Sequence, residues 1–188
     1  SLFVNYSKSI NSFYDYHKID FKIEKNIKLI QLGEVDFQII GGYISKDILP
    51  YPLSYNMKGS FKAGTPVINN SFGTMGYNEF VATKYGALFY NHNIGKIANR
   101  ETFAPELILI QNIGFGNNIN IIQHENIELK SMEKGYYESG FYLKNLFSFQ
   151  NIIGQTGFGM GFIYRYGPYA HQKELDNLVF KFSLDIDI

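Results

Sequence analysis

Residues 177–188 read NLVFKFSLDIDI, and this stretch indicates the fold more clearly than any other part of the chain. Its even positions are all apolar: Leu178, Phe180, Phe182, Leu184, Ile186 and Ile188. Because successive side chains of a strand point to opposite faces, a strand would gather these residues on one face. The opposite face would carry Lys181, Ser183, Asp185 and Asp187. The run is roughly twice as long as a usual strand and close to the roughly 9–11 residues with which a tilted strand crosses a bilayer.

Composition limits the possible classes of protein. The chain has 188 residues, enough for one domain, and its 17 basic and 17 acidic residues cancel. This balance argues against a nucleic-acid partner, which a basic surface would attract. Cysteine is absent, which excludes disulfides and thiolate metal sites. Aromatic residues make up 17% of the chain, all Phe or Tyr, and this favours strands over helices. The apolar runs are too short for a membrane-spanning helix.

Five further stretches read as strands: residues 19–29, 35–43, 107–116, 137–149 and 158–166. In the last of these, the aromatic residues and Met160 would lie opposite three glycines and Arg165. Weaker runs at residues 2–10, 72–80 and 85–93 bring the prediction to eight or nine strands and no helix.

Two long stretches interrupt this pattern. Residues 46–71 contain three prolines and the pair Asn69-Asn70, and residues 117–135 are rich in Asn, Gln and His. Connections of this length are normally functional or mobile. We therefore predict one domain over residues 1–188, with a long loop or plug at 46–71 and a long loop at 117–135.

Long strands, a short turn near residues 150–155 and long loops elsewhere are typical of a membrane barrel. In lipid every backbone amide needs a partner within the protein, so a sheet can span a bilayer only when it closes. The sequence thus predicts an antiparallel transmembrane β-barrel whose strands turn an apolar face toward lipid and a polar face toward a lumen. The predicted lumen-facing residues are Lys144, Arg165, Lys181, Asp185 and Asp187.

A soluble all-β module remains the alternative. A β-sandwich or soluble barrel also alternates apolar and polar positions, with the apolar face turned toward a core. In that case tyrosines in the loops, such as Tyr51 and Tyr169, would bind glycans or peptides. The two classes differ in what covers the apolar face.

The sequence offers little support for catalysis. The four histidines, at positions 17, 92, 124 and 171, have no paired ligand spacing for a metal. The glycines from Gly157 to Gly161 continue a strand and do not open a helix, so they form no phosphate loop. No Gly-x-Ser-x-Gly motif is present. We therefore expect a protein that is not an enzyme and that needs no cofactor or metal.

Several motifs resemble the C-terminal barrel of a family of Bacteroidota outer-membrane proteins of unknown function, which carry an N-terminal carboxypeptidase-regulatory-like domain. The motifs are Pro50-Tyr51-Pro52, Asn78-Glu79-Phe80 with Tyr85, His92, Tyr164-Arg165-Tyr166-Gly167-Pro168-Tyr169 and Asp176-Asn177. The similarity runs from about Lys18 to the end of the chain.

The resemblance implies that these strands are part of a larger barrel in the outer membrane of a Gram-negative bacterium. The last strand would then be the signal by which the barrel-insertion machinery recognises the chain. The implied function is transport, or protein assembly and translocation, across that membrane. Implied partners are outer-membrane lipid, the insertion machinery and other outer-membrane or periplasmic proteins.

Overall fold

The computed structural model describes residues 1–10, 15–45, 50–60, 64–98, 100, 103–117, 130–151 and 154–187, and these residues form an all-β structure. One large sheet has the strand order β1-β2-β3-β7-β8-β9-β10-β11-β5. Its strands are β1 (Leu2–Lys8), β2 (His17–Leu29), β3 (Gly33–Ile44), β7 (Lys84–Lys96), β8 (Glu106–Asn117), β9 (Met132–Asn151), β10 (Gly154–Tyr166), β11 (Leu178–Asp187) and β5 (Thr65–Pro66). A second sheet pairs β4 (Tyr55–Asn56) with β6 (Val81–Ala82).

The helical content of the described residues is two short 3-10 turns, Tyr51–Leu53 and Glu174–Asn177. Within the described residues, no helix is long and apolar enough to cross a membrane.

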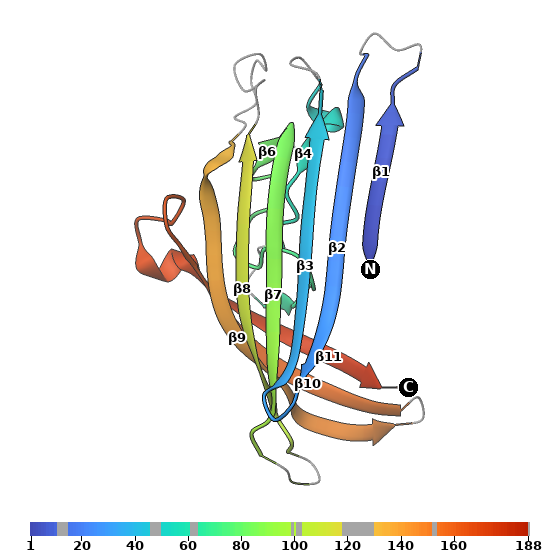
Figure 1. The fold of residues 1–188 in the computed structure, drawn as a ribbon. Helices are drawn as coiled ribbons and strands as arrows, with labels where there is room; N and C mark the ends of the chain where they lie inside the picture. Colours follow the sequence, from blue (N-terminus) through green and yellow to red (C-terminus); the bar gives the residue numbers. More distant parts are fainter. Residues whose placement is uncertain are drawn as a thin grey trace.

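The eight long strands follow one another as antiparallel neighbours, and only β5 runs parallel to its partner, β11. At one end of the sheet, β2 turns into β3 through residues 30–32, and β9 ends at Asn151 beside Gly154, where β10 begins. At the other end, the connections from β3 to β7 and from β10 to β11 are longer (Figure 1). We call these the short-turn end and the long-loop end.

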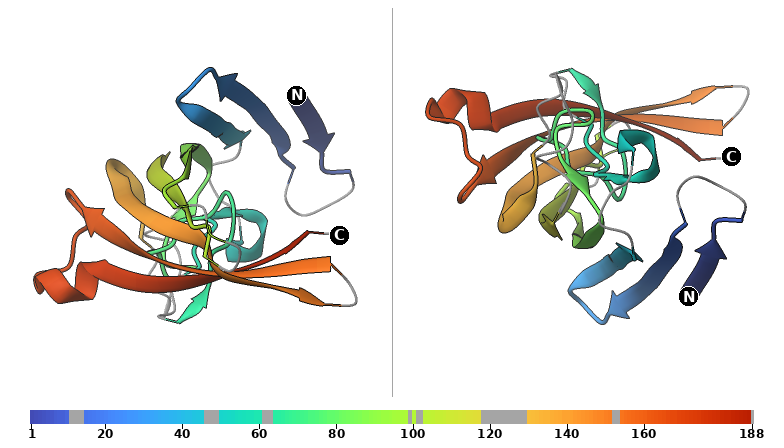
Figure 2. Two further views of the ribbon diagram at one scale, coloured as in Figure 1. Left: turned by 90° about the horizontal axis from the view of Figure 1, so that it is seen from below. Right: turned by 90° about the horizontal axis from the view of Figure 1, so that it is seen from above.

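The sheet curls strongly but does not close. Viewed along the strands, β1–β3 lie on one side of the connection between β3 and β7, and β9–β11 pass across its other side (Figure 2). In the described residues, β1 is one edge of the sheet and β5, beside β11, is the other. The predicted all-β antiparallel sheet is therefore confirmed, whereas the sheet itself is not closed into a barrel.

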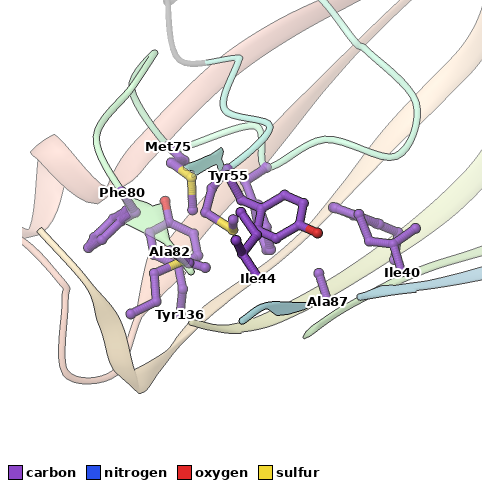
Figure 3. Packing of buried hydrophobic residues seen from close by; sticks show 12 residues of the cluster. Ile40, Ile44, Tyr55, Met75, Phe80, Ala82, Ala87 and Tyr136 are labelled. Atoms are coloured by element: carbon purple, nitrogen blue, oxygen red, sulfur yellow. The ribbon is translucent and has the colours of Figure 1, made fainter. Parts of the chain in front are cut away.

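The concave face is covered by the connection from β3 to β7, which we call the internal segment (described residues 50–60 and 64–83). It contributes half of a buried apolar cluster whose other members lie on β3, β7 and β9 (Figure 3). The cluster consists of Ile40, Ile44, Tyr55, Met57, Phe72, Met75, Phe80, Ala82, Ala87, Phe89, Met132 and Tyr136. The strand predicted at residues 72–80 was wrong, because these residues form turns and bends that pack against the sheet.

The range predicted as a second long loop is only partly described. Residues 118–129 lie outside the described residues, as do residues 46–49 and 61–63 of the first predicted loop. Strand β9 begins at Met132, so residues 132–135 belong to a strand and not to the loop.

Strands β9 and β10 bend near the short-turn end, and glycines allow the bend. Gly159 and Gly161 are buried on the concave face, where an added Cβ would overlap the Leu143 and Phe141 carbonyl oxygens, respectively. Asn145 has a left-handed backbone (φ 54°), and the register shifts between Phe158 and Met160. The two strands can approach closely here because no side chain lies between them.

Candidate functional site

The burial pattern of β10 is the reverse of that in a water-soluble sheet. Phe158, Met160 and Phe162 point outward with 39–42% of their surface exposed. Between them, Gly159 and Gly161 are buried, and Arg165 further along is only 3% exposed. A soluble protein normally buries large apolar side chains and leaves charged ones in water.

Strand β2 shows the same reversal. Its outward residues are Ile19, Phe21 and Ile23, which are 37–44% exposed. On its inward face, Lys18, Asp20, Lys22 and Glu24 are half-buried. Strands far apart in the sheet order thus present apolar side chains outward. On the inward face, charged residues lie beside the buried apolar cluster.

The structure places the residues predicted as sites in β11 and its neighbours as follows. Leu178 and Phe180 are exposed on the outward face, 43% and 37% respectively, and Phe182 is half-buried. The side chains of Leu184, Asp185, Ile186 and Asp187, and all of Ile188, lie outside the described residues. Lys181 and Arg165 are buried at 1% and 3% exposure, and Lys144 is half-buried.

Exposed aromatic residues lie near both ends of the outward face. At the long-loop end, Tyr137 stacks on Tyr166 with 5.8 Å between ring centroids and contacts Phe115 edge-on at 5.9 Å. Toward the short-turn end, Phe147 and Phe149 are 62% and 50% exposed. Exposed aromatic residues also lie between these two groups, for example Phe141 and Phe162.

The polar groups within this outward face satisfy one another. The Ser139 hydroxyl donates to Gln111 Oε1 at 2.6 Å, and Gln111 Nε2 donates to the Tyr166 hydroxyl at 3.0 Å. Such mutual pairing lowers the cost of placing polar groups where water is scarce.

On the inward face, Glu138 of β9 holds the internal segment. Its side chain is fully buried, and it accepts hydrogen bonds from the backbone amides of Gly73 and Thr74 at 2.8 and 2.9 Å. It also accepts from the Thr74 hydroxyl at 2.6 Å and from Asn112 Nδ2 at 2.7 Å. Four hydrogen-bond donors thus converge on one side chain, which fixes the internal segment to β9.

Arg165 of β10 makes a second anchor. Its Nη2 atom lies 2.8 Å from Glu79 Oε1 of the internal segment, and its guanidinium lies 4.6 Å from the Tyr136 ring centroid. The planar guanidinium can pair with the carboxylate and stack on the ring at the same time, which a lysine could not do. Its Nε atom is buried and has no partner among the described residues.

Lys181 of β11 makes a third anchor. Its buried ammonium donates to the Ser60 carbonyl oxygen and to Thr65 Oγ1, the latter at 2.7 Å. Charged residues from three neighbouring strands, β9, β10 and β11, therefore fix the internal segment to the concave face.

Tyr55 connects the internal segment to the opposite wall. Its hydroxyl donates to Asp20 Oδ1 at 2.6 Å, and the Lys18 ammonium lies 4.4 Å from its ring centroid. Burial raises the pKa of the Tyr55 phenol well above its usual range, and the hydrogen bond to Asp20 raises it further. The neutral phenol is therefore the form that the fold accommodates.

A cavity of about 690 Å³ lies on the concave face in the half of the sheet nearer the short-turn end. Its walls come from β2, β3, β7, β8, β9 and β11, and residues 66–70 of the internal segment border it. Lys144, one of the residues predicted to face a lumen, lies in the wall of this cavity.

The anchors show which residues the sequence pattern singled out and which it missed. Arg165 and Lys181 were predicted to face inward because they lie opposite the apolar faces of their alternating strands. Glu138 has the same kind of position, on the inward face of β9 two residues from Gly140 and Tyr136, but nothing in the sequence pairs it with Thr74, 64 residues away. In the described residues, no cluster of three or more His, Asp and Glu side chains could hold a metal ion.

Comparisons with known proteins gave no match: no family model, no curated protein and no solved structure matches this chain.

Proposed function

We propose that this chain forms part of an outer-membrane β-barrel, with its outward apolar face in lipid and its inward face lining a lumen. The observation that carries the proposal is the reversed burial pattern, in which Phe162 and Phe180 are exposed while Arg165 and Lys181 are buried. A bilayer would stabilise this arrangement, because hydrocarbon would surround the outward apolar side chains while the charged side chains keep polar partners inside the protein.

Strand length supports the same proposal. Strands β2, β7 and β10 each have 13 residues, and β3 and β8 each have 12. At about 3.3 Å per residue and a tilt of roughly 35–45°, such strands exceed the apolar band about 25 Å tall that these barrels present to lipid.

The proposed barrel contains more strands than the eight long ones described. A closed eight-stranded barrel has an interior just wide enough for side chains. Here the concave face accommodates the main chain of the internal segment, with Phe72, Met75 and Val81 at most 1% exposed. A closed barrel around this interior needs additional strands, which would pair with the edge of β1 and satisfy its backbone groups.

On this proposal the apolar residues Leu178, Phe180, Phe182, Leu184, Ile186 and Ile188 face lipid and serve as the insertion signal. The proposed lumen-facing residues are Lys144, Arg165, Lys181, Asp185 and Asp187. The short-turn end faces the periplasm and the long-loop end faces outward, as in known barrels of this class. Its role is non-enzymatic, either transport or protein assembly and translocation, with the anchored internal segment restricting the lumen.

The test compares two substitutions on the outward face of β10. Phe162 lies in the middle of the strand, and Tyr166 lies at its long-loop end. In lipid vesicles, Phe162→Arg should lower the free energy of unfolding by about 2–4 kcal/mol, and Tyr166→Arg by about 0–1 kcal/mol. Guanidinium titration, followed by the mobility of the folded band on unheated gels, measures both values.

The soluble alternative gives a different result. If the outward face met water, the protein would purify without detergent, and both arginine variants would stay within about 0.5 kcal/mol of the parent, as exposed substitutions usually do. That outcome would reject the membrane barrel and favour a soluble glycan- or peptide-binding module.

A further inference from the structure

The cavity at the short-turn half of the concave face has an unusual lining, rich in side-chain amides. Asn69 and Asn70 come from the internal segment, Asn91 from β7 and Gln38 from β3. Its volume, about 690 Å³, lies within the roughly 300–1,000 Å³ of small-molecule sites.

Several of these amides have unused hydrogen-bonding groups. Asn69, Asn70 and Asn91 make no side-chain hydrogen bond within the described part of the chain. Gln38 is only 5% exposed, and although its Nε2 atom donates to Glu24, its Oε1 atom is buried without a partner. The amides that a ligand could reach are those of Asn69, which is exposed, and of Asn70 and Asn91, which are half-buried.

The charges around the cavity disfavour ionic ligands. The acidic residues of the lining are Glu24, Glu34 and Asp36, and the basic ones are Lys25 and Lys144. Two of the carboxylates are already engaged, because Asp36 accepts from Asn26 at 2.6 Å and Glu24 pairs with Lys22 at 3.1 Å. Neither an anion nor a cation would find a strong net field in such a mixed lining.

The walls also disfavour an extended peptide. Peptides that bind sheets usually add a strand to a free edge. The strands β2, β3, β7, β8 and β9 that form most of the lining are hydrogen-bonded on both sides, so the cavity offers side chains and not a backbone edge.

We propose that this cavity binds an uncharged polyhydroxyl ligand, namely a short neutral oligosaccharide. Each asparagine amide presents a donor and an acceptor side by side, which matches the neighbouring hydroxyls of a sugar ring. Val67 and Tyr142 add apolar surface to the lining, against which the C–H face of a ring can pack. The inference concerns the inward face and does not depend on whether lipid or water covers the outward one.

The experiment titrates the folded protein, purified in detergent, with neutral trisaccharides by isothermal calorimetry. Maltotriose, cellotriose and chitotriose are the probes, with an end-blocked tetraglycine and inorganic phosphate as comparison ligands. We expect saturable binding of at least one trisaccharide with a Kd on the order of 1 mM or lower and no binding of the other two ligands.

Two variants locate the site. Asn91→Leu replaces one amide by an apolar side chain with the same branching, and Asn70→Gly removes another while keeping the left-handed backbone (φ 57°). Each should weaken binding by about three- to tenfold, as expected for the loss of a neutral hydrogen bond. The matched control, Asn56→Leu, removes an exposed amide of the internal segment outside the cavity and should leave the affinity unchanged.

Two outcomes overturn the inference. One is that none of the three trisaccharides binds saturably at concentrations up to about 10 mM, whether or not tetraglycine or phosphate binds instead. The other is binding that responds equally to Asn56→Leu and to the two cavity variants. A variant that fails to fold shows no change in tyrosine fluorescence when denaturant is added. If one of the two cavity variants fails to fold, the other still tests the site.

Discussion

Replacing Glu138 by alanine tests whether the buried carboxylate anchors the internal segment. The substitution removes the acceptor for the amides of Gly73 and Thr74, 2.8 and 2.9 Å away. The other two donors keep partners, because the Thr74 hydroxyl still meets the Tyr136 hydroxyl at 2.7 Å and Asn112 Nδ2 still meets the Ser71 carbonyl oxygen at 3.3 Å.

The magnitude follows from the two amides that lose their acceptor. Leaving a buried donor unsatisfied costs about 1–3 kcal/mol, so Glu138→Ala should lower the free energy of unfolding by about 2–6 kcal/mol. Thr74 is 3% exposed, so bulk water does not reach this part of the segment in the parent fold. We therefore expect both a loss of stability and faster hydrogen exchange at Gly73 and Thr74.

The assay combines guanidinium unfolding of the refolded protein with hydrogen exchange read by mass spectrometry over residues 70–80. Glu133→Ala is the matched control, because Glu133 is an exposed glutamate on the same strand. It should change stability by less than about 0.5 kcal/mol and leave the exchange of residues 70–80 unaltered. Equal effects of Glu133→Ala and Glu138→Ala on both measurements would refute the anchor.

Three further predictions concern the bend, the second anchor and alkaline pH. Gly161→Val should cost about 1–3 kcal/mol by forcing β9 and β10 apart, whereas Gly86→Ala, which has open space on its side of β7, should be near neutral in the same unfolding titration. Arg165→Lys should fail to restore the stability lost in Arg165→Met, and a double-mutant cycle with Glu79→Gln should give a coupling energy of about 0.5–3 kcal/mol, with zero coupling counting against the ion pair. Because the folded protein raises the pKa of Tyr55, the contribution of this residue to stability is complete below the unfolded pKa of about 10 and is lost as the pH rises above it. The free energy of unfolding of Tyr55→Phe should therefore fall less at alkaline pH than that of the parent. Identical pH profiles of the two proteins would contradict this.

The strands themselves were largely predictable from the sequence. The alternation in residues 177–188 and 158–166 predicted β11 and β10, because side chains of an extended backbone must alternate, and Phe162 and Phe180 share the exposed face of these strands. Residues 72–80 misled the same reasoning. Their apolar side chains, including Phe72 and Phe80, are buried by packing onto the sheet, and burial alone does not require an extended backbone.

The pairing of anchors with the internal segment could not be predicted. Glu138 and Thr74 are 64 residues apart, and Lys181 and Ser60 are 121 residues apart. No local pattern encodes such pairs, because many polar residues on inward faces are chemically equivalent until the chain folds. The same applies to the cavity, whose asparagines come from different strands and from the internal segment.

By itself, the sequence determined the class of secondary structure, the alternation of apolar and polar side chains along the clearest strands and the absence of any thiol chemistry. These properties depend on residue type and on spacing along a few neighbouring positions. The tertiary structure decided where the internal segment lies, which charges hold it and that a polar cavity remains beside it. Those features depend on contacts between distant parts of the chain, which form only because the curled sheet brings its inward faces around a common interior.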